Sequence, residues 1–285
     1  MTTPIHAVLL ISCRDAPGIV RALASFVADH GGNILDSDQH LDPRSGVFFT
    51  RLAFTLDGFR APREELGARA AALLDGLEPE VEVRFSDRRK RGAVLVSKTN
   101  HCLYDLLLRQ ESGELRCDLP LVIGNHDDLR PVAEHFARPF HHLPVTAATR
   151  AAQEVALQAL LELEQIDFVV LARYMQVLSP DFVARWPARI INIHHSFLPA
   201  FSGARPYHQA YARGVKVIGA TGHYVTADLD QGPIVAQDVV HVSHRDSVRD
   251  LVHKGRDLEK VVLARAVRAH VEDRILVYAN KTVVF

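Results

Sequence analysis

The segment DFVVLARYMQVLSPDFVARWPARIINI, residues 167–193, contains two continuous apolar runs, DFVVLARY and RIINI. Two further runs of this kind, AVLVS at 93–97 and LPLVIGN at 119–125, precede it. Segments with a helical pattern separate the runs, near residues 101–111, 128–137 and 148–164. Continuous apolar strands divided by helices indicate a Rossmann-like, mostly parallel sheet with helices on both faces. Such a sheet binds its ligands at the carboxyl ends of its strands.

The chain on either side of these runs predicts two domains. Two longer strands are expected at residues 215–225 and 233–242, followed by a helix over 246–270. The N-terminal part shows strand and helix patterns in the order βαββαβ, which is typical of a ferredoxin-like α+β unit. We therefore expect a ferredoxin-like domain at 1–86, a charged linker at 87–91 and an α/β domain at 92–285.

Composition and charge exclude several classes of function. The chain has 33 basic and 34 acidic residues and a net charge of −1, which gives no electrostatic basis for binding nucleic acid or an anionic membrane. No apolar run approaches the roughly 20 residues that span a bilayer, and the N-terminus lacks the pattern of a secretory signal. The cysteines Cys13, Cys102 and Cys117 form no CxxC pair, which favours a reducing compartment, and we expect the cytoplasm.

The sequence RIINIHHSFLPAFSGARPYHQA, residues 189–210, places polar side chains directly behind a buried strand. Asn192 and His194 are two residues apart, so in an extended segment both side chains leave the same face. An amide donor and an imidazole on one face can stabilise an oxyanion and transfer a proton. The alternative is that both only satisfy backbone groups of the loop, and spacing alone favours this alternative.

Other kinds of site have weaker support. Among the 16 histidines, His194–His195 and His141–His142 are adjacent pairs whose side chains diverge, and no HExxH motif occurs. Ser196 lies in no GxSxG motif, so a serine nucleophile has no support. The chain also lacks GxGxxG and P-loop fingerprints. We therefore expect neither a metal site nor a cofactor.

A second stretch, GATGHYVTADLDQGPIVAQ at 219–237, contains His223 and, seven residues later, Asp230 in the turn LDQGP. An aspartate at such a turn is usually a turn former. In this order, however, the two stretches, with LARYMQVLSP upstream of them, resemble the formyltransferase-fold family that uses 10-formyltetrahydrofolate. The matching pattern is an Asn-x-His, an S-x-LP-x-F-x-G loop and an H-x-V-x(4)-D-x-GP-I segment.

This resemblance implies roles for particular residues. The family's catalytic asparagine, histidine and aspartate fall on Asn192, His194 and Asp230. Its folate-binding positions fall on Met175, Gln176, Val177, Leu178, His223, Val225, Thr226, Ala227, Asp228 and Leu229.

The acceptor of the formyl group is expected to be water. Where a phosphate-binding relative carries a glycine-rich loop, this chain reads SKTNHCLYDLL at 97–107, so backbone amides are less free to wrap a phosphate. Over essentially its whole length the chain resembles the formyltetrahydrofolate deformylases. That resemblance implies hydrolysis of 10-formyltetrahydrofolate to formate and tetrahydrofolate, which would supply formate for purine biosynthesis. Transfer to an amine acceptor and a catalytically silent amino-acid sensor are the alternatives.

The N-terminal segment CRDAPGIVRALASFVADHGGNI resembles an ACT domain, a ferredoxin-like module that commonly binds amino acids at subunit interfaces. The resemblance implies a possible effector site at Asp15, Gly18 and Asn33, and at least a dimer, with a tetramer as the other option. A domain that only dimerises is an equally good interpretation of the same residues.

Overall fold

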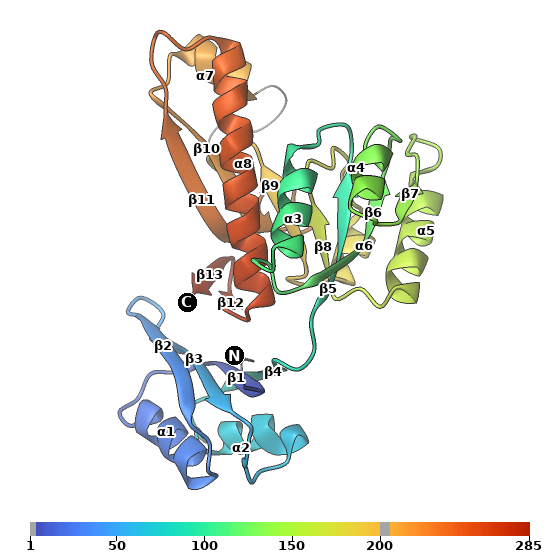
Figure 1. Cartoon of the computed structure of the whole chain (residues 1–285). Helices are drawn as coiled ribbons and strands as arrows, with labels where there is room; N and C mark the ends of the chain where they lie inside the picture. The colour runs from blue at the N-terminus through green and yellow to red at the C-terminus, as the bar shows by residue number, and fades with distance from the viewer. Residues whose placement is uncertain (1–3, 200–205) are drawn as a thin grey trace. The chain divides into compact units, whose positions relative to one another are not determined.

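The computed structural model describes residues 4–199 and 206–285, and its chain divides into two compact units (Figure 1). The first unit contains the N-terminal residues up to Arg89 together with Asp273–Tyr278 and Thr282–Phe285. The second contains Lys90–Glu272 and Ala279–Lys281. The chain therefore crosses between the units inside the predicted linker, whereas its C-terminal residues, expected in the α/β domain, group with the N-terminal unit.

The first unit has the predicted βαββαβ order and an antiparallel sheet with strand order β2-β3-β1-β4. Successive residues of β1 point to opposite faces of the sheet and contribute to two hydrophobic cores. Ala7 and Leu9 pack with the helices on one face. Val8 and Leu10 pack with Leu276 and the C-terminal residues on the other face. This second core explains why the C-terminal strands belong here. The elements are β1 (His6–Arg14), α1 (Ile19–Asp29), β2 (Ile34–Asp42), β3 (Val47–Thr55), the short 3-10 helix η1 (Arg63–Glu65), α2 (Leu66–Ala72), β4 (Glu80–Phe85), β12 (Ile275–Tyr278) and β13 (Lys281–Val284).

The second unit is built on a seven-stranded sheet with strand order β11-β10-β9-β8-β5-β6-β7. The pairings from β9 to β7 are parallel, as predicted, and β10 and β11 continue the sheet antiparallel. Its strands are β5 (Arg91–Val96), β6 (Asp118–Gly124), β7 (Phe140–His142), β8 (Phe168–Leu171), β9 (Ile190–His194), β10 (Val217–Tyr224) and β11 (Ile234–His241). Its helices are α3 (His101–Glu111), α4 (Arg130–His135), α5 (Arg150–Leu163), α6 (Pro180–Ala184), α7 (Pro206–Arg213) and α8 (Val248–Val271).

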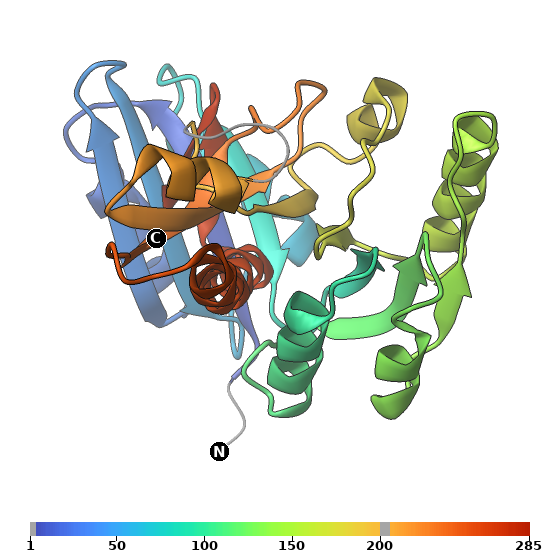
Figure 2. The same cartoon turned by 90° about the horizontal axis from the view of Figure 1, so that it is seen from above.

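Helices cover both faces of this sheet (Figure 2). Leu157 and Leu161 of α5 and Phe182 of α6 pack with Ala93 and Leu95 of β5 on one face. Helices α3 and α8 contact each other on the other face, and α8 crosses β9, β10 and β11. No helix in the described part of the chain is long and apolar enough to cross a membrane. Residues that follow the carboxyl ends of β5, β6, β8 and β9, namely Thr99, Asn125, Arg173 and His195, line two pockets.

The sequence did not predict several short elements, namely β7, α6, α7 and the pair β12–β13. Strand β7 has three residues and α6 five, too few to show a periodic pattern. Helix α6 is instead fixed by its start, where the Ser179 hydroxyl accepts a hydrogen bond from the Phe182 amide and Pro180 occupies the first turn.

Candidate active site

Asn192 and His194 lie in β9, at its carboxyl half, as the sequence predicts. Across the β9–β10 ladder Asn192 is paired with His223, and their side chains meet, with Asn192 Nδ2 3.1 Å from His223 Nε2. His194 is 6 % exposed, and its Nδ1 lies 3.2 Å from Asp230 Oδ2. The structure thus brings the three predicted catalytic residues together, with His223 as a fourth member of the cluster.

Asp230 reaches the cluster from the loop between β10 and β11. Its backbone has a φ of 55°, a left-handed conformation that aspartate tolerates better than most residues. The hydrogen bond from His194, and next the nearby imidazole of His223, hold the pKa of its carboxyl far below the ordinary value, although partial burial opposes the shift. The carboxylate is therefore ionised throughout the physiological pH range.

Close backbone packing fixes the loop that carries Asp230. The Tyr224 amide donates to the Pro233 carbonyl at 2.9 Å, which closes the base of the loop. A side chain at Gly232 would place its Cβ only 1.8 Å from the Tyr224 carbonyl oxygen. Glycine is thus the residue that lets the loop fold back on β10, and this close approach positions Asp230 beside the two imidazoles.

His223 has a more central place than the folate contact predicted for it. The ring is 1 % exposed, and its Nδ1 donates a hydrogen bond to the Tyr224 carbonyl at 2.9 Å. Nδ1 therefore carries a proton, and in the neutral ring Nε2 has a free lone pair that accepts from the Asn192 amide. This contact turns the amide nitrogen of Asn192 toward the cluster and leaves its second N–H for another acceptor. The sequence could not predict this role, because it depends on the pairing of His223 with Asn192 across β9 and β10, and the register of two strands cannot be read from local patterns.

The residues predicted to bind folate form two groups, one in the segment after β8 and one in the loop after β10. In the segment after β8, Met175 and Val177 are exposed, and Gln176 is half-buried, whereas Leu178 is buried in the core against Phe182. In the loop after β10, Val225 packs against this core from its edge. The rest of that loop, Thr226, Ala227, Asp228 and Leu229, ranges from half-buried to exposed. Their role in folate binding stays a prediction.

The three residues of the predicted effector site do not come together in one chain. Asp15 follows β1, and its amide donates to the Gly46 carbonyl at 3.0 Å, while Gly18 caps α1 with a φ of 98°. Asn33 lies at the opposite end of the nine-residue strands, where its amide donates to the Thr55 hydroxyl at 3.0 Å. At about 3.3 Å per residue, a strand of this length separates the two ends by roughly 30 Å.

Beside the cluster of predicted catalytic residues lies an open pocket of about 310 Å³. His195 is among its lining residues, and its ring stacks on that of His194 with a centroid separation of 5.4 Å. Burial, and next the charge of Arg173, lowers the pKa of His195 to about 4, so this ring is neutral at physiological pH. A smaller pocket, which includes Ser97, Asn125 and Gln176, shares Arg173 and Met175 with the first.

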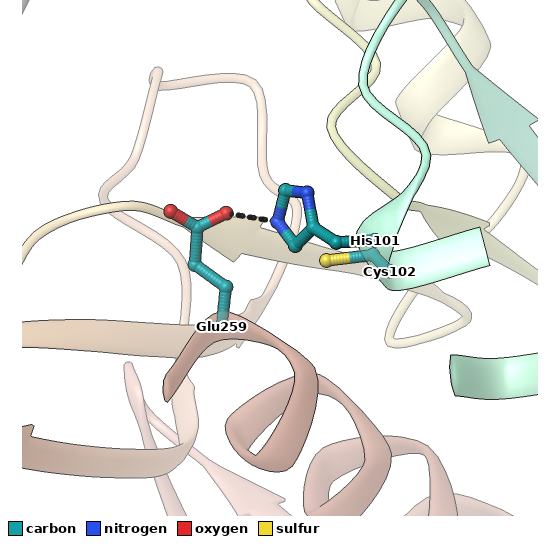
Figure 3. A group of neighbouring side chains, drawn as sticks. All are labelled: His101, Cys102 and Glu259. Carbon is teal, nitrogen blue, oxygen red and sulfur yellow. Dashed lines mark hydrogen bonds and ion pairs between the residues drawn. The ribbon is translucent and has the colours of Figure 1, made fainter. Parts of the chain in front are cut away.

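His101 and Glu259 line the first pocket and lie next to the buried Cys102, with potential ligand atoms of the three residues within 4.8 Å of one another (Figure 3). These groups already satisfy one another: His101 Nε2 lies 2.7 Å from Glu259 Oε2, and the Tyr207 hydroxyl donates to Glu259 Oε1 at 2.6 Å. Burial raises the pKa of the Cys102 thiol well above its ordinary value, which keeps it protonated and a poor metal ligand. The arrangement fits a buried hydrogen-bond network around Glu259 better than a metal site.

Two known protein families match the two domains of this chain. The formyl transferase family model matches residues 90–267, more than half of the chain, and the ACT domain model matches residues 7–71. The chain is therefore an ACT domain joined to a formyl transferase domain, as the two folds indicate.

Full-length relatives then identify the family. The formyltetrahydrofolate deformylase of Synechocystis sp. is 57 % identical over 279 residues, 98 % of each chain, and that of Bacillus subtilis is 48 % identical over 97 % of this chain and 93 % of its own. The crystal structure of the deformylase from Pseudomonas syringae pv. tomato superimposes with a TM-score of 0.95 at 45 % identity, over 100 % of this chain and 95 % of that one. The chain belongs to the formyltetrahydrofolate deformylase family.

Proposed function

We propose that this protein hydrolyses 10-formyltetrahydrofolate to formate and tetrahydrofolate. The observation that carries the proposal is the cluster of Asn192, His194, His223 and Asp230 at the carboxyl end of β9, in a chain of the deformylase family. The cluster combines an amide donor, an imidazole and an ionised carboxylate without an amino-acid nucleophile among them. Such a set activates water and stabilises an oxyanion, which is what hydrolysis of a formamide requires.

In the proposed reaction, water attacks the formyl carbon while a proton passes from the water to the cluster. The free N–H of Asn192 and the imidazole of His194 stabilise the oxyanion that develops on the formyl oxygen. The tetrahedral intermediate then collapses as N10 takes a proton, which breaks the C–N bond and releases formate and tetrahydrofolate. Asp230 compensates the positive charge that arises on His194 when its ring holds the additional proton.

Hydrolysis can be tested with the purified full chain and 10-formyltetrahydrofolate in a buffer that contains no amine acceptor. We expect formate and tetrahydrofolate in equal amounts, with turnover reduced by orders of magnitude in Asp230→Asn. Asp257→Asn is the matched control, because it makes the same change on an exposed side chain of α8. Product that forms only when an amine is added would identify a formyltransferase, and no product with any acceptor would favour an amino-acid sensor.

We further propose that the chemistry needs no metal or cofactor, and that the protein is a cytoplasmic homo-oligomer. Strand β2 supports self-association, since it forms one edge of its sheet, is exposed over most of its length and carries exposed Ile34, Leu35 and Leu41. A second copy is also the simplest way to bring Asn33 near Asp15 and Gly18, as an amino-acid effector site would require. Sedimentation with and without amino acids tests both statements.

A further inference from the structure

Arg173 occupies an unusual backbone position next to the catalytic cluster. It follows β8 with a φ of 62°, in the left-handed region that favours glycine. Its side chain is 15 % exposed and lines both pockets at the carboxyl ends of the strands. The fold thus places a long cationic side chain where the backbone alone would favour glycine.

The charge of Arg173 is only loosely compensated. Its nearest carboxylate is Glu259, with Nε and Oε2 3.6 Å apart, beyond hydrogen-bonding distance. Arg173 Nε is buried without a hydrogen-bond partner among the residues that the structure describes. Glu259 cannot easily approach, because its two oxygens already accept hydrogen bonds from His101 and Tyr207.

The surroundings of Arg173 favour an anion. Arg256 also lines the larger pocket, and Glu259 is the one acidic residue among its described lining residues. His195 is neutral at physiological pH, so it contributes polar ring atoms to the pocket but no charge. Its ring stacks on that of His194, so the pocket lies next to the catalytic cluster. A guanidinium presents donors in a planar fork that matches the two oxygens of a carboxylate.

We propose that this pocket is a carboxylate site that receives formate from the adjacent catalytic cluster, with Arg173 as its principal ligand. This inference rests on the proposed hydrolysis, which produces formate beside His194. The anion would move past the His195 ring and pair with the guanidinium of Arg173, whose nearest carboxylate among the described residues is that of Glu259, 3.6 Å away.

Calorimetric titration of the full-length protein with sodium formate, at constant ionic strength set with sodium chloride, tests the proposal. Formate has three heavy atoms, so we expect a Kd no tighter than about 1 mM. Arg173→Gln should weaken binding at least about tenfold, and Arg173→Lys should weaken it less, because lysine keeps the charge and loses the fork. Arg116→Gln, which removes an exposed arginine away from both pockets, is the control and should bind as the natural protein does. Circular dichroism confirms that each variant is folded.

A second arm distinguishes the source of the carboxylate. The glutamate tail of folate offers the same chemistry, so N-(4-aminobenzoyl)glutamate is titrated in the same way. Formate binding that this compound does not displace, and that depends on Arg173, supports the proposal. Equal formate affinity in Arg173→Gln, or displacement of formate by aminobenzoylglutamate, overturns it. Formate release from 10-formyltetrahydrofolate, measured in parallel, separates a failure of this inference from a failure of the proposed hydrolysis.

Discussion

Replacing His195 by glutamine should remove a large part of the acid sensitivity of the catalytic unit. The pKa of His195 is about 4 in the folded protein, because the ring is buried and faces Arg173. In the unfolded chain a histidine titrates near 6.5. Since the folded pKa is the lower of the two, the unfolded state binds more protons between these values, and stability falls as the pH falls from about 6.5 toward 4.

The two pKa values give the size of the effect. Between pH 7 and pH 5, protonation of His195 in the unfolded chain removes about 2 kcal/mol from the free energy of unfolding. Urea unfolding at several pH values measures this change in the free energy of unfolding. The fluorescence of Trp186, the single tryptophan, follows unfolding of the unit that contains His195, because Trp186 lies in the core of that unit. The advantage of the natural protein over His195→Gln should shrink by about 2 kcal/mol on acidification. Parallel curves for the two proteins would refute the argument. His208→Gln, an exposed histidine of the same pocket, is the control.

Three further predictions follow from the geometry. Asn192→Ala should lose about 3 kcal/mol of transition-state stabilisation, which is the usual value for one oxyanion donor, and should appear in kcat; a change confined to KM would show a ground-state role. Gly232→Ala should displace the loop that carries Asp230, since its Cβ would overlap the Tyr224 carbonyl, and the variant should be folded but nearly inactive. A chain of residues 90–272 should keep hydrolysis and lose assembly, as a rate assay and sedimentation would show; loss of formate release in a folded truncated chain would contradict this.

The sequence predicts the architecture well where long periodic segments determine it. The apolar runs at β5, β6, β8 and β9 could be assigned because a parallel sheet covered on both faces buries nearly every residue of its strands. The C-terminal strands could not be assigned to a domain in this way. Leu276 and Tyr278 pack with Val8 and Phe49, about 230 to 270 residues earlier, and local patterns carry no information about such a contact.

The site was predictable in part. The spacing of Asn192 and His194 identifies a shared face, and Asp230 could be recognised only through its motif, because an aspartate in a turn has a simpler explanation. The buried role of His223 depends on its register opposite Asn192. The position of Arg173 depends on a backbone conformation that the sequence does not indicate, since left-handed φ values are unusual for arginine.

The ionisation of Asp230 indicates how the cluster handles the proton of the attacking water. A general base is most effective when its pKa lies near the working pH, and a carboxyl whose pKa is far below its ordinary value is a weak proton acceptor. The carboxylate lies 3.2 Å from His194 Nδ1 and 3.6 Å from His223 Nε2, so the contacts that lower this pKa also hold the carboxylate beside both rings. Asp230 therefore acts best as a fixed negative charge that orients the His194 ring. In the proposed mechanism the His194 imidazole, whose Nδ1 contacts this carboxylate, takes the proton from water and returns it to N10.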